Sequence, residues 1–283
     1  MKGWLNWREI EKNNDWGIRD KDDATAAMWG KGAASWEERA QREDDFNRRQ
    51  VEAMELLPTD RVLDVCCGPG PLTRWIAPRV KAVTACDFSE SMLDFVREKA
   101  AKLGFGNVDY LQGNFYTLEP GVDAPLFDVA VTRHSPAQGD ILRFSRWATR
   151  RCYSLMAVYQ PQQQRKAGQP SLFIKSAKEN NGEINCAARP DGRLYGVNVH
   201  FNLLYDMGAD PELTYVTEEL HLTGKDPQDI YRQTQKNRPF THEEFEWWRE
   251  TAGDRLRQEG DLWTFVNVQK MALLSWDPSQ IKY

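Results

Sequence analysis

The stretch Val62-Leu-Asp-Val-Cys-Cys-Gly-Pro-Gly70 decides the fold of this 283-residue chain. Its adjacent cysteines, Cys66 and Cys67, suggest a metal or redox site, whereas its apolar start and glycine end indicate a buried strand followed by a ligand-binding turn. Glycines at such a turn let the chain reverse sharply and let a ligand approach the backbone closely. Adjacent residues on a strand point to opposite faces, so two neighbouring cysteines are badly placed to bind one metal ion. The pattern therefore favours the strand and turn.

The composition is that of a globular protein. Hydrophobic residues make up 41% and charged residues 28% of the chain, and no apolar run approaches the ~20 residues that cross a bilayer. The charged N-terminus lacks the apolar segment of a secretory signal, and the five cysteines form no CxxC pair. We expect a cytoplasmic protein with reduced cysteines, no metal site and no membrane partner. The formal net charge of -5 argues against a nucleic-acid partner, although a local basic patch would permit one, and a homodimer is compatible with the sequence.

After residue 60, apolar strand-like runs alternate with amphipathic segments. The runs are RVLDV (61–65), AVTAC (82–86), VDYLQ (108–112), FDVAVT (127–132) and CYSLMAV (152–158), and the clearest helix is predicted over 89–104. Apolar strands separated by helices indicate a parallel sheet that is covered on both faces. We therefore predict an α/β fold with a doubly wound, mostly parallel, seven-stranded sheet.

Other regions surround this core. Residues 1–55 are polar, aromatic and helix-prone, and we expect a helical cap in which residues 25–40 form a turn between two helices. Residues 56–283 would form one domain, with an insertion of about 159–210 after the fifth strand. The remaining predicted elements are helices over 198–208, 226–237 and 241–258 and strands over 213–222 and 262–276. Gly208 would stop the first of these helices, and Thr241 with Glu244 fits a capping box at the start of the last.

An acidic residue, Asp87, ends the second predicted strand, 17 residues beyond Gly70. A carboxylate at this place in a doubly wound fold accepts hydrogen bonds from ribose hydroxyls. Thr73 stands where the dinucleotide fingerprint GxGxxG has its third glycine, which argues against a nicotinamide or flavin dinucleotide. The strand, the turn and the acid together indicate a ligand that contains a nucleoside.

These residues resemble the class I S-adenosylmethionine-dependent methyltransferases, whose first motif reads roughly hhDhGxGxG, where h is apolar. Leu63–Gly70 is similar to this motif, except that Cys66 stands where glycine is commonest. The resemblance covers residues 60 to about 158. It implies a Rossmann-like sheet with a reversed, antiparallel last strand, S-adenosylmethionine as the cofactor and S-adenosylhomocysteine as its product.

The resemblance also implies cofactor-binding residues, which follow the ends of the first four strands or belong to the cap. They are Asp64, Cys66, Gly68, Gly70, Asp87, Phe88, Met92, Asn114, Phe115, Thr132 and Trp36. Asp87 would bind the ribose hydroxyls, and Asp64 with the turn backbone would hold the methionine end. Packing in the core would equally account for Phe88, Met92 and Phe115.

The substrate would lie beyond the fourth strand, at Thr132-Arg-His-Ser-Pro136. There His134 would act as a general base, because its ordinary pKa lies near neutrality, and Arg133 would bind an anionic group. The alternative is that His134 only lines the pocket or caps the following helix. Further substrate-binding candidates from the cap and the insertion are Trp29, Tyr195, His200 and Tyr205.

The leading hypothesis is an enzyme that transfers a methyl group from S-adenosylmethionine to an oxygen, nitrogen or sulfur atom of a small molecule. A protein side chain or tRNA is an alternative acceptor, and a non-catalytic module that binds the cofactor or a nucleoside is an alternative class. The Asn-Pro-Pro-Tyr signature of nucleic-acid amino-methyltransferases is absent from 132–136, which weakens the case for a nucleic-acid base. The cap and the insertion, as two lids, favour a site with room for a second molecule.

Overall fold

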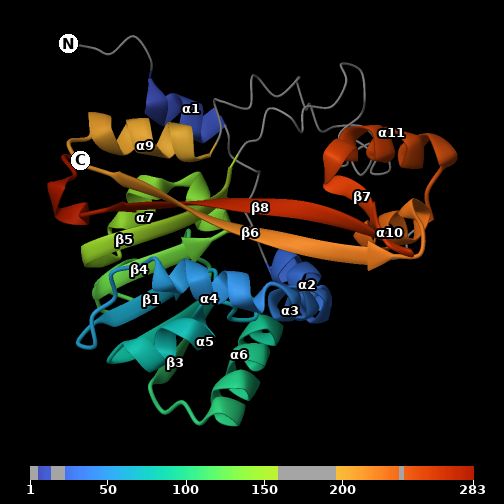
Figure 1. The fold of residues 1–283 in the computed structure, drawn as a ribbon. Helices are drawn as coiled ribbons and strands as arrows, with labels where there is room; N and C mark the ends of the chain where they lie inside the picture. Colours follow the sequence, from blue (N-terminus) through green and yellow to red (C-terminus); the bar gives the residue numbers. More distant parts are fainter. Residues whose placement is uncertain (1–5, 14–22, 159–195, 236–238) are drawn as a thin grey trace. The chain divides into compact units, whose positions relative to one another are not determined.

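The computed structural model describes residues 6–13, 23–158, 196–235 and 239–283 (Figure 1). Tyr195 and most of the predicted insertion lie outside these described residues. The chain divides into two compact units. Unit 1 covers Met1–Val158, Arg189–Val216 and Met271–Tyr283, and unit 2 covers Tyr159–Ala188 and Thr217–Lys270. The predicted domain boundary at residue 55 does not coincide with this division and stays a prediction.

The central sheet confirms the predicted fold class, a mostly parallel sheet with antiparallel last strands, but the described residues form eight strands in it rather than the predicted seven. Its strand order is β3-β2-β1-β4-β5-β8-β6, and β7 pairs with β8 beside this path. Pairing is parallel between β1 and β2, β2 and β3, β1 and β4, and β4 and β5, and antiparallel between β5 and β8. The bounds are β1 Arg61–Val65, β2 Ala82–Asp87, β3 Val108–Gln112, β4 Phe127–Arg133, β5 Ala148–Ala157, β6 Glu212–Gly224, β7 Leu256–Glu259 and β8 Leu262–Trp276.

The order of the strands creates a switch point between β1 and β4. From β1 the chain passes to β2 and β3 on one side, and it then returns to β4 on the other side of β1. Val65 is paired with both Cys86 and Thr132, so the residues that follow β1, β2 and β4 leave the sheet at the same edge. Ligands of doubly wound folds bind at this edge, beside the switch point.

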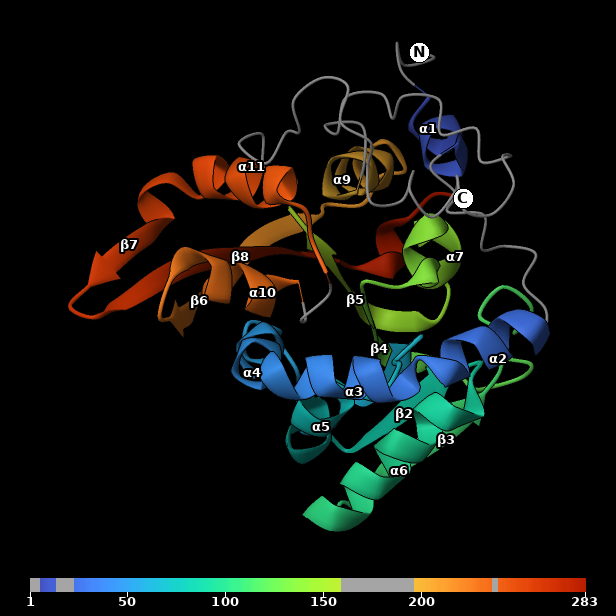
Figure 2. The ribbon, with the colours of Figure 1, turned by 90° about the vertical axis from the view of Figure 1, so that its right-hand side faces the viewer.

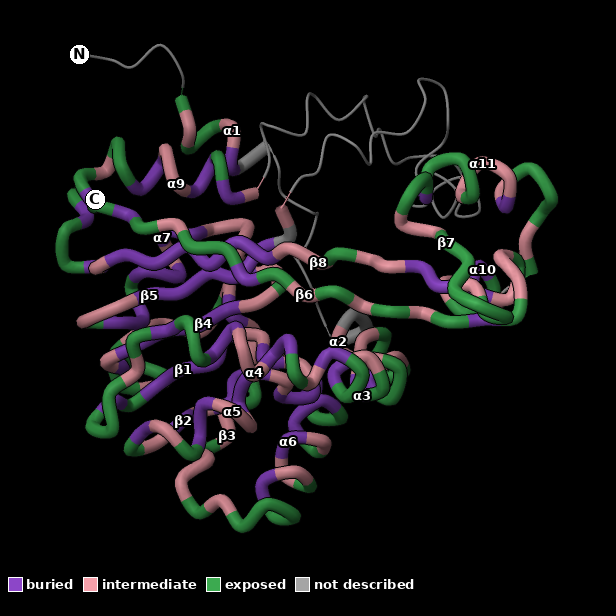
Figure 3. Tube along the Cα trace, in the orientation of Figure 1, coloured by how far each residue is buried: buried purple, intermediate pink, exposed green. Residues whose placement is uncertain are grey.

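The strands of unit 1 are apolar because both faces of the sheet are covered. Figure 3 shows β1 and β4 as largely buried segments. On β1, Leu63 and Val65 pack in one hydrophobic cluster, whereas Val62 packs in another. This alternation explains why the strand appears in the sequence as a continuous apolar run rather than as a pattern with one polar face.

The helices α2 (Asp23–Lys31), α3 (Ala33–Arg42) and α4 (Asp44–Glu52) precede the sheet. The predicted turn over 25–40 is wrong, because Gly32 alone separates α2 from α3 and its backbone N–H donates to the Trp29 carbonyl at 3.0 Å. Figure 2 shows these helices following one another beside α5 (Thr73–Ile76) and α6 (Glu90–Leu103). α2 and α3 contact α6, and α4 contacts α5. The N-terminal helices therefore lie next to the turn that connects β1 with α5.

Two further helices pack together in unit 1. The predicted helix over 198–208 is confirmed as α9 (Val197–Asp206), which is followed by Gly208 at φ +91° and contacts α1 (Trp7–Asn13). Glu11 of α1 accepts a hydrogen bond from the backbone N–H of Ile141 at 2.9 Å. This bond satisfies the first residue of α7 (Ile141–Ser145), so α1 is tied to the segment that follows β4.

Unit 2 holds α10 (Pro227–Thr234), α11 (His242–Ala252) and β7 around a small core of Ile230, Ala252 and Phe265. The predicted capping box is confirmed, since Thr241 and Glu244 exchange side-chain to backbone hydrogen bonds of 2.8 and 3.1 Å. The predicted helix over 241–258 ends early, at Ala252, because Gly253 adopts φ +52° and β7 follows. No helix in the described ranges has the length and apolar character that crossing a bilayer requires.

Candidate active site

The turn after β1 is held in a left-handed backbone conformation. Cys66, Gly68 and Gly70 have φ values of +53°, +56° and +77°. A Cβ atom added at Gly68 would meet no atom within 4 Å, whereas one added at Gly70 would come within 3.0 Å of Cγ2 of Val96. Gly70 is therefore needed for close packing against α6, and Gly68 leaves open space beside the backbone, as a bound ligand would require.

Asp87 connects this turn with the end of β2. Its carboxylate is only 6% exposed, and it accepts hydrogen bonds from the backbone N–H groups of Gly68 at 2.9 Å and Ser89 at 3.0 Å. Burial raises the pKa of Asp87, although these backbone donors oppose the shift. Each carboxylate oxygen can accept more than one hydrogen bond, so Asp87 retains acceptor capacity for hydroxyl groups of a ligand.

Asp64 is a second buried carboxyl group beside Asp87. It is 2% exposed and accepts a hydrogen bond of 2.6 Å from Oγ1 of Thr73. Burial raises the pKa of Asp64 to about 7, with a further contribution from the negative charge of Asp87, while the Thr73 hydrogen bond acts in the opposite direction. Two neighbouring carboxyl groups with raised pKa values favour a ligand that carries positive charge.

The end of β4 is also strained. His134 has φ +46°, and it and Cys66 are the two non-glycine residues with positive φ in the described part of the chain. The His134 backbone N–H donates to the Leu155 carbonyl at 3.2 Å, and Oγ1 of the fully buried Thr132 donates to the Val65 carbonyl at 3.2 Å. Strained residues at the ends of two adjacent strands, beside a switch point, are typical of functional sites.

The His134 ring is exposed to solvent at this edge. The surrounding protein lowers the pKa of His134, and the positive charges of Arg133 and Arg39 lower it further. The imidazole is therefore neutral at pH 7, so it is a weaker proton acceptor than an unperturbed histidine but can still accept a hydrogen bond.

Arg133 is turned toward the N-terminal helices. Its Nε donates to Oε1 of Gln50 at 2.9 Å, and its Nη2 donates to Oε2 of Glu43 at 2.7 Å. Burial lowers the pKa of Arg133, and the carboxylate of Glu43 opposes this shift. The guanidinium thus anchors α4 and its N-cap to the sheet, and the predicted role in binding an anionic substrate would have to use its remaining donors.

The predicted cap residues Trp29 and Trp36 lie together, with ring centroids 5.9 Å apart, and the Arg39 guanidinium lies 5.5 Å from the centre of the Trp36 ring.

A cavity of about 460 Å³ lies beside this cap, between α2 and the ends of β2 and β3. It is lined by Ala26, Ala27, Gly30, Lys31, Phe88, Ser89, Glu90, Ser91 and Gln112. The predicted residue Phe88 is therefore next to Asp87 and faces open space.

The other predicted cofactor residues are more enclosed. Phe115 is 4% exposed in a core cluster and packs edge-on against Tyr116. Met92 is buried in α6, and Oδ1 of Asn114 accepts a hydrogen bond from the Tyr116 backbone at 3.0 Å. Phe115 and Met92 thus have the packing role that the sequence left open, and their predicted contact with adenine stays a prediction.

The structure does not bring the predicted substrate-binding residues of α9 together. His200 is buried, and its Nε2 lies 3.7 Å from Oε1 of Glu11. Burial lowers the pKa of His200 to about 4, so it is neutral and serves the packing of α9 on α1. Tyr205 is 65% exposed and points to solvent, and Tyr195 lies outside the described residues.

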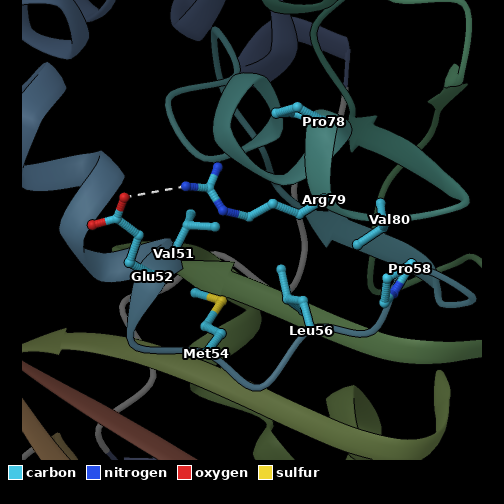
Figure 4. A pocket seen from close by; sticks show the side chains of 8 residues that line it. All are labelled: Val51, Glu52, Met54, Leu56, Pro58, Pro78, Arg79 and Val80. Carbon is cyan, nitrogen blue, oxygen red and sulfur yellow. Dashed lines mark hydrogen bonds and ion pairs between the residues drawn. The ribbon is translucent and has the colours of Figure 1, made fainter.

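A second cavity, of about 490 Å³, lies away from these groups (Figure 4). Its walls come from the end of α4 and from segments that precede β1 and β2, so it lies at the opposite ends of the strands. The lining residues are Val51, Glu52, Met54, Leu56, Pro58, Pro78, Arg79 and Val80. Arg79 and Glu52 form an ion pair of 3.2 Å at its side, which indicates a structural contact.

Several site residues were not predicted from the sequence. They are Glu37, Glu43, Gln50, Thr73 and Lys99, of which all but Lys99 are buried polar groups. Glu37, Glu43, Gln50 and Lys99 belong to charged segments that look like solvated helix faces in the sequence. In the sequence, Thr73 marks only a departure from the dinucleotide fingerprint, although its hydroxyl faces Asp64.

Residues 62–150 match the family model described as a methyltransferase domain. This part of the chain is therefore similar to a methyltransferase domain. The chain is 35% identical over 77 residues to a demethylmenaquinone methyltransferase of Bacillus cytotoxicus, a match that covers 26% of this chain and 32% of that protein. It is also 36% identical over 67 residues to a 23S rRNA (uracil(1939)-C(5))-methyltransferase of Klebsiella pneumoniae, covering 24% of this chain and 15% of that protein.

The chain thus spans about a third or less of the length of these curated relatives. Among solved structures, a geranyl diphosphate methyltransferase in complex with S-adenosylmethionine matches 93% of this chain and 95% of its own, with 15% identity and a TM-score of 0.49. Magnesium protoporphyrin IX methyltransferase of Synechocystis PCC 6803 matches 82% of each chain, with 15% identity and a TM-score of 0.42.

Proposed function

We propose that the protein is an S-adenosylmethionine-dependent methyltransferase that acts on an oxygen, nitrogen or sulfur nucleophile of a small molecule. The observation that carries this proposal is the pair of buried carboxyl groups, Asp64 and Asp87, around a left-handed turn at the switch point. A cytoplasmic location and a homodimeric assembly belong to the proposal as predictions from the sequence.

The residues present fit the proposed cofactor in two respects. Gly68 has open space on its ligand side, so the sulfur and amino-acid part of a ligand could approach the backbone. Burial raises the pKa values of Asp64 and Asp87, so the unliganded site penalises negative charge. S-adenosylmethionine carries a net positive charge through its sulfonium and ammonium groups, and it would stabilise both carboxylates.

Each residue would then have a defined task. Asp87 would accept hydrogen bonds from the ribose hydroxyls while it keeps the Gly68 backbone in place, and Phe88 would cover the base beside the cavity of about 460 Å³. Asp64, fixed by Thr73, would face the positively charged amino-acid end. When bound, S-adenosylmethionine would supply a methyl group on a positively charged sulfur, for transfer to a nucleophile with the thioether as the leaving group.

The acceptor would lie at the end of β4, because this is the exposed side of the switch point opposite Asp87. His134 presents a neutral imidazole there, which can accept a hydrogen bond from the acceptor's O–H, N–H or S–H group and so orient its lone pair. Its lowered pKa favours orientation over full proton removal. The proton released by the acceptor would then pass to solvent through this exposed edge.

Calorimetric titration of the protein with S-adenosylmethionine and with S-adenosylhomocysteine tests the proposal. We expect binding of both with one site per chain. A folded protein that binds neither compound would refute the function. Binding without methyl transfer to any small molecule, protein or tRNA in a tritiated-methyl assay would instead favour the non-catalytic module.

A further inference from the structure

Helix α6 presses one face against the glycine turn. Val96 and Lys99 are three residues apart, so they lie on the same face of the helix. Cγ2 of Val96 occupies the space in which a side chain at Gly70 would lie, since an added Cβ would come within 3.0 Å of it. Nζ of Lys99 donates a hydrogen bond of 2.7 Å to the carbonyl of Pro69.

The hydrogen bond from Lys99 holds the peptide group between Pro69 and Gly70, which closes the turn. The Gly70 backbone N–H donates to the Cys67 carbonyl at 3.1 Å, which makes residues 67–70 a hydrogen-bonded β-turn with Gly68 at φ +56°. The Pro69 carbonyl belongs to the same peptide group as that N–H. Lys99 therefore holds the peptide from one side while Cys67 holds it from the other, and the tilt of the turn is set by both bonds.

Glu37 of α3 positions Lys99. Its Oε2 pairs with the Lys99 ammonium, and its Oε1 accepts a hydrogen bond of 2.8 Å from Nε2 of Gln41. Glu37 is 7% exposed, and a buried carboxylate is retained only where such partners satisfy it. Burial lowers the pKa of Lys99, and the charge of Glu37 opposes that shift and keeps the ammonium protonated.

This pair differs from the other ion pairs of α6. Arg97 pairs with Glu90 and Asp94 at 2.7 and 2.8 Å, but all three side chains are substantially exposed and lie on α6 itself. Exposed pairs of this kind add little to stability. Lys99 and Glu37, by contrast, join two helices that are distant in the sequence, and Lys99 touches the turn directly.

We infer that Lys99 and Glu37 are positioning residues that set the geometry of the Cys67–Gly70 turn for the amino-acid part of the cofactor. The inference rests on the proposed function. Helix α3 would then contribute to the cofactor site, because the Glu37 carboxylate that orients Lys99 belongs to that helix. The turn would contact the amino-acid portion of the ligand, whereas Asp87 would bind the nucleoside portion, so the two parts of the ligand should respond differently to a change at Lys99.

Two probes separate these parts: S-adenosylhomocysteine, which has the amino-acid portion, and 5′-methylthioadenosine, which lacks it. We expect Lys99→Met to raise the Kd of S-adenosylhomocysteine about tenfold, the size of a lost hydrogen bond to a charged group. The Kd of 5′-methylthioadenosine should stay within about twofold of the wild-type value. Glu37→Gln keeps the side-chain shape and should give a smaller change of the same kind.

Arg97→Met on the same helix is the matched control, and we expect it to leave both Kd values unchanged. Thermal unfolding of each variant shows that the protein is folded before titration. Unchanged binding of S-adenosylhomocysteine by folded Lys99→Met would overturn the inference. An equal loss of both probes would also overturn it, because general loosening of α6 would explain that result. Failure of the wild-type protein to bind either probe would refute the proposed function itself.

Discussion

The raised pKa of Asp64 makes the stability of the protein depend on pH in a defined way. The folded state holds the Asp64 pKa at about 7, against an ordinary value of 3.8. Because the pKa is raised by folding, the protonated carboxyl contributes stability that is complete below about pH 4 and is lost as the pH rises through 7. At 1.36 kcal/mol for each pKa unit, the whole difference corresponds to about 4 kcal/mol.

Asp64→Asn isolates this contribution. An asparagine oxygen can still accept the hydrogen bond from Thr73, and the amide does not ionise. Other groups titrate equally in both proteins, so the difference in unfolding free energy between wild type and variant reports Asp64. Between pH 5 and pH 8 this difference should move by about 2.5 kcal/mol in favour of the variant. The variant should be the more stable protein in alkaline solution.

The measurement is urea unfolding of both proteins, followed by tryptophan fluorescence at half-unit pH steps without cofactor. Wild type and variant should diverge steadily from pH 5 to 7 and run parallel above pH 8. A constant difference across this range would show that Asp64 is ionised in the folded state at all these pH values. That result would refute the argument that burial beside Asp87 governs the charge of the site.

Three further predictions concern the same site. Asp87→Ala should weaken binding of S-adenosylhomocysteine by about 1–3 kcal/mol, the cost of a lost charged hydrogen-bond partner, and calorimetry would contradict this if the Kd were unchanged. Gly68→Ala should cost about 1–2 kcal/mol in urea unfolding because of its positive φ, since no atom lies close enough to clash. His134→Ala should lower the turnover rate. The pH–rate profile of the wild-type enzyme should show no inflection near pH 6.5, because the pKa of His134 is lowered. Equal turnover in the two proteins would remove His134 from the mechanism.

The sheet could be predicted because its strands are buried on both faces. Five apolar runs correspond to β1 to β5, and the boundary that differs most is the start of β5, which begins at Ala148 rather than at residue 152. The missed part contains Arg150 and Arg151, which pair with Asp60 and Glu212. Charged side chains interrupt the apolar pattern there, although their ion pairs allow them to lie in a strand.

The center of the site could be predicted for a different reason. Backbone geometry and ligand chemistry require Asp64, Gly68 and Asp87 at fixed distances in the sequence from the ends of two strands. A short local motif is therefore enough to predict them. The partners of the helical cap are not local. Glu37 and Lys99 are 62 residues apart, and Glu43 and Arg133 are 90 residues apart. Each looks like one more surface charge until the tertiary structure brings its partner close.

The charges of the site also explain why two cysteines can stand in the first motif. Burial raises the pKa values of both Cys66 and Cys67, and the negative charge of Asp87 adds to both shifts. The thiols are therefore held in the neutral form, which is neither nucleophilic nor suited to metal binding. The same acidic surroundings that suppress thiolate favour a positively charged ligand. Asp64 and Asp87 thus provide one physical cause for both properties, and the adjacent cysteines act as small neutral side chains in a tight turn.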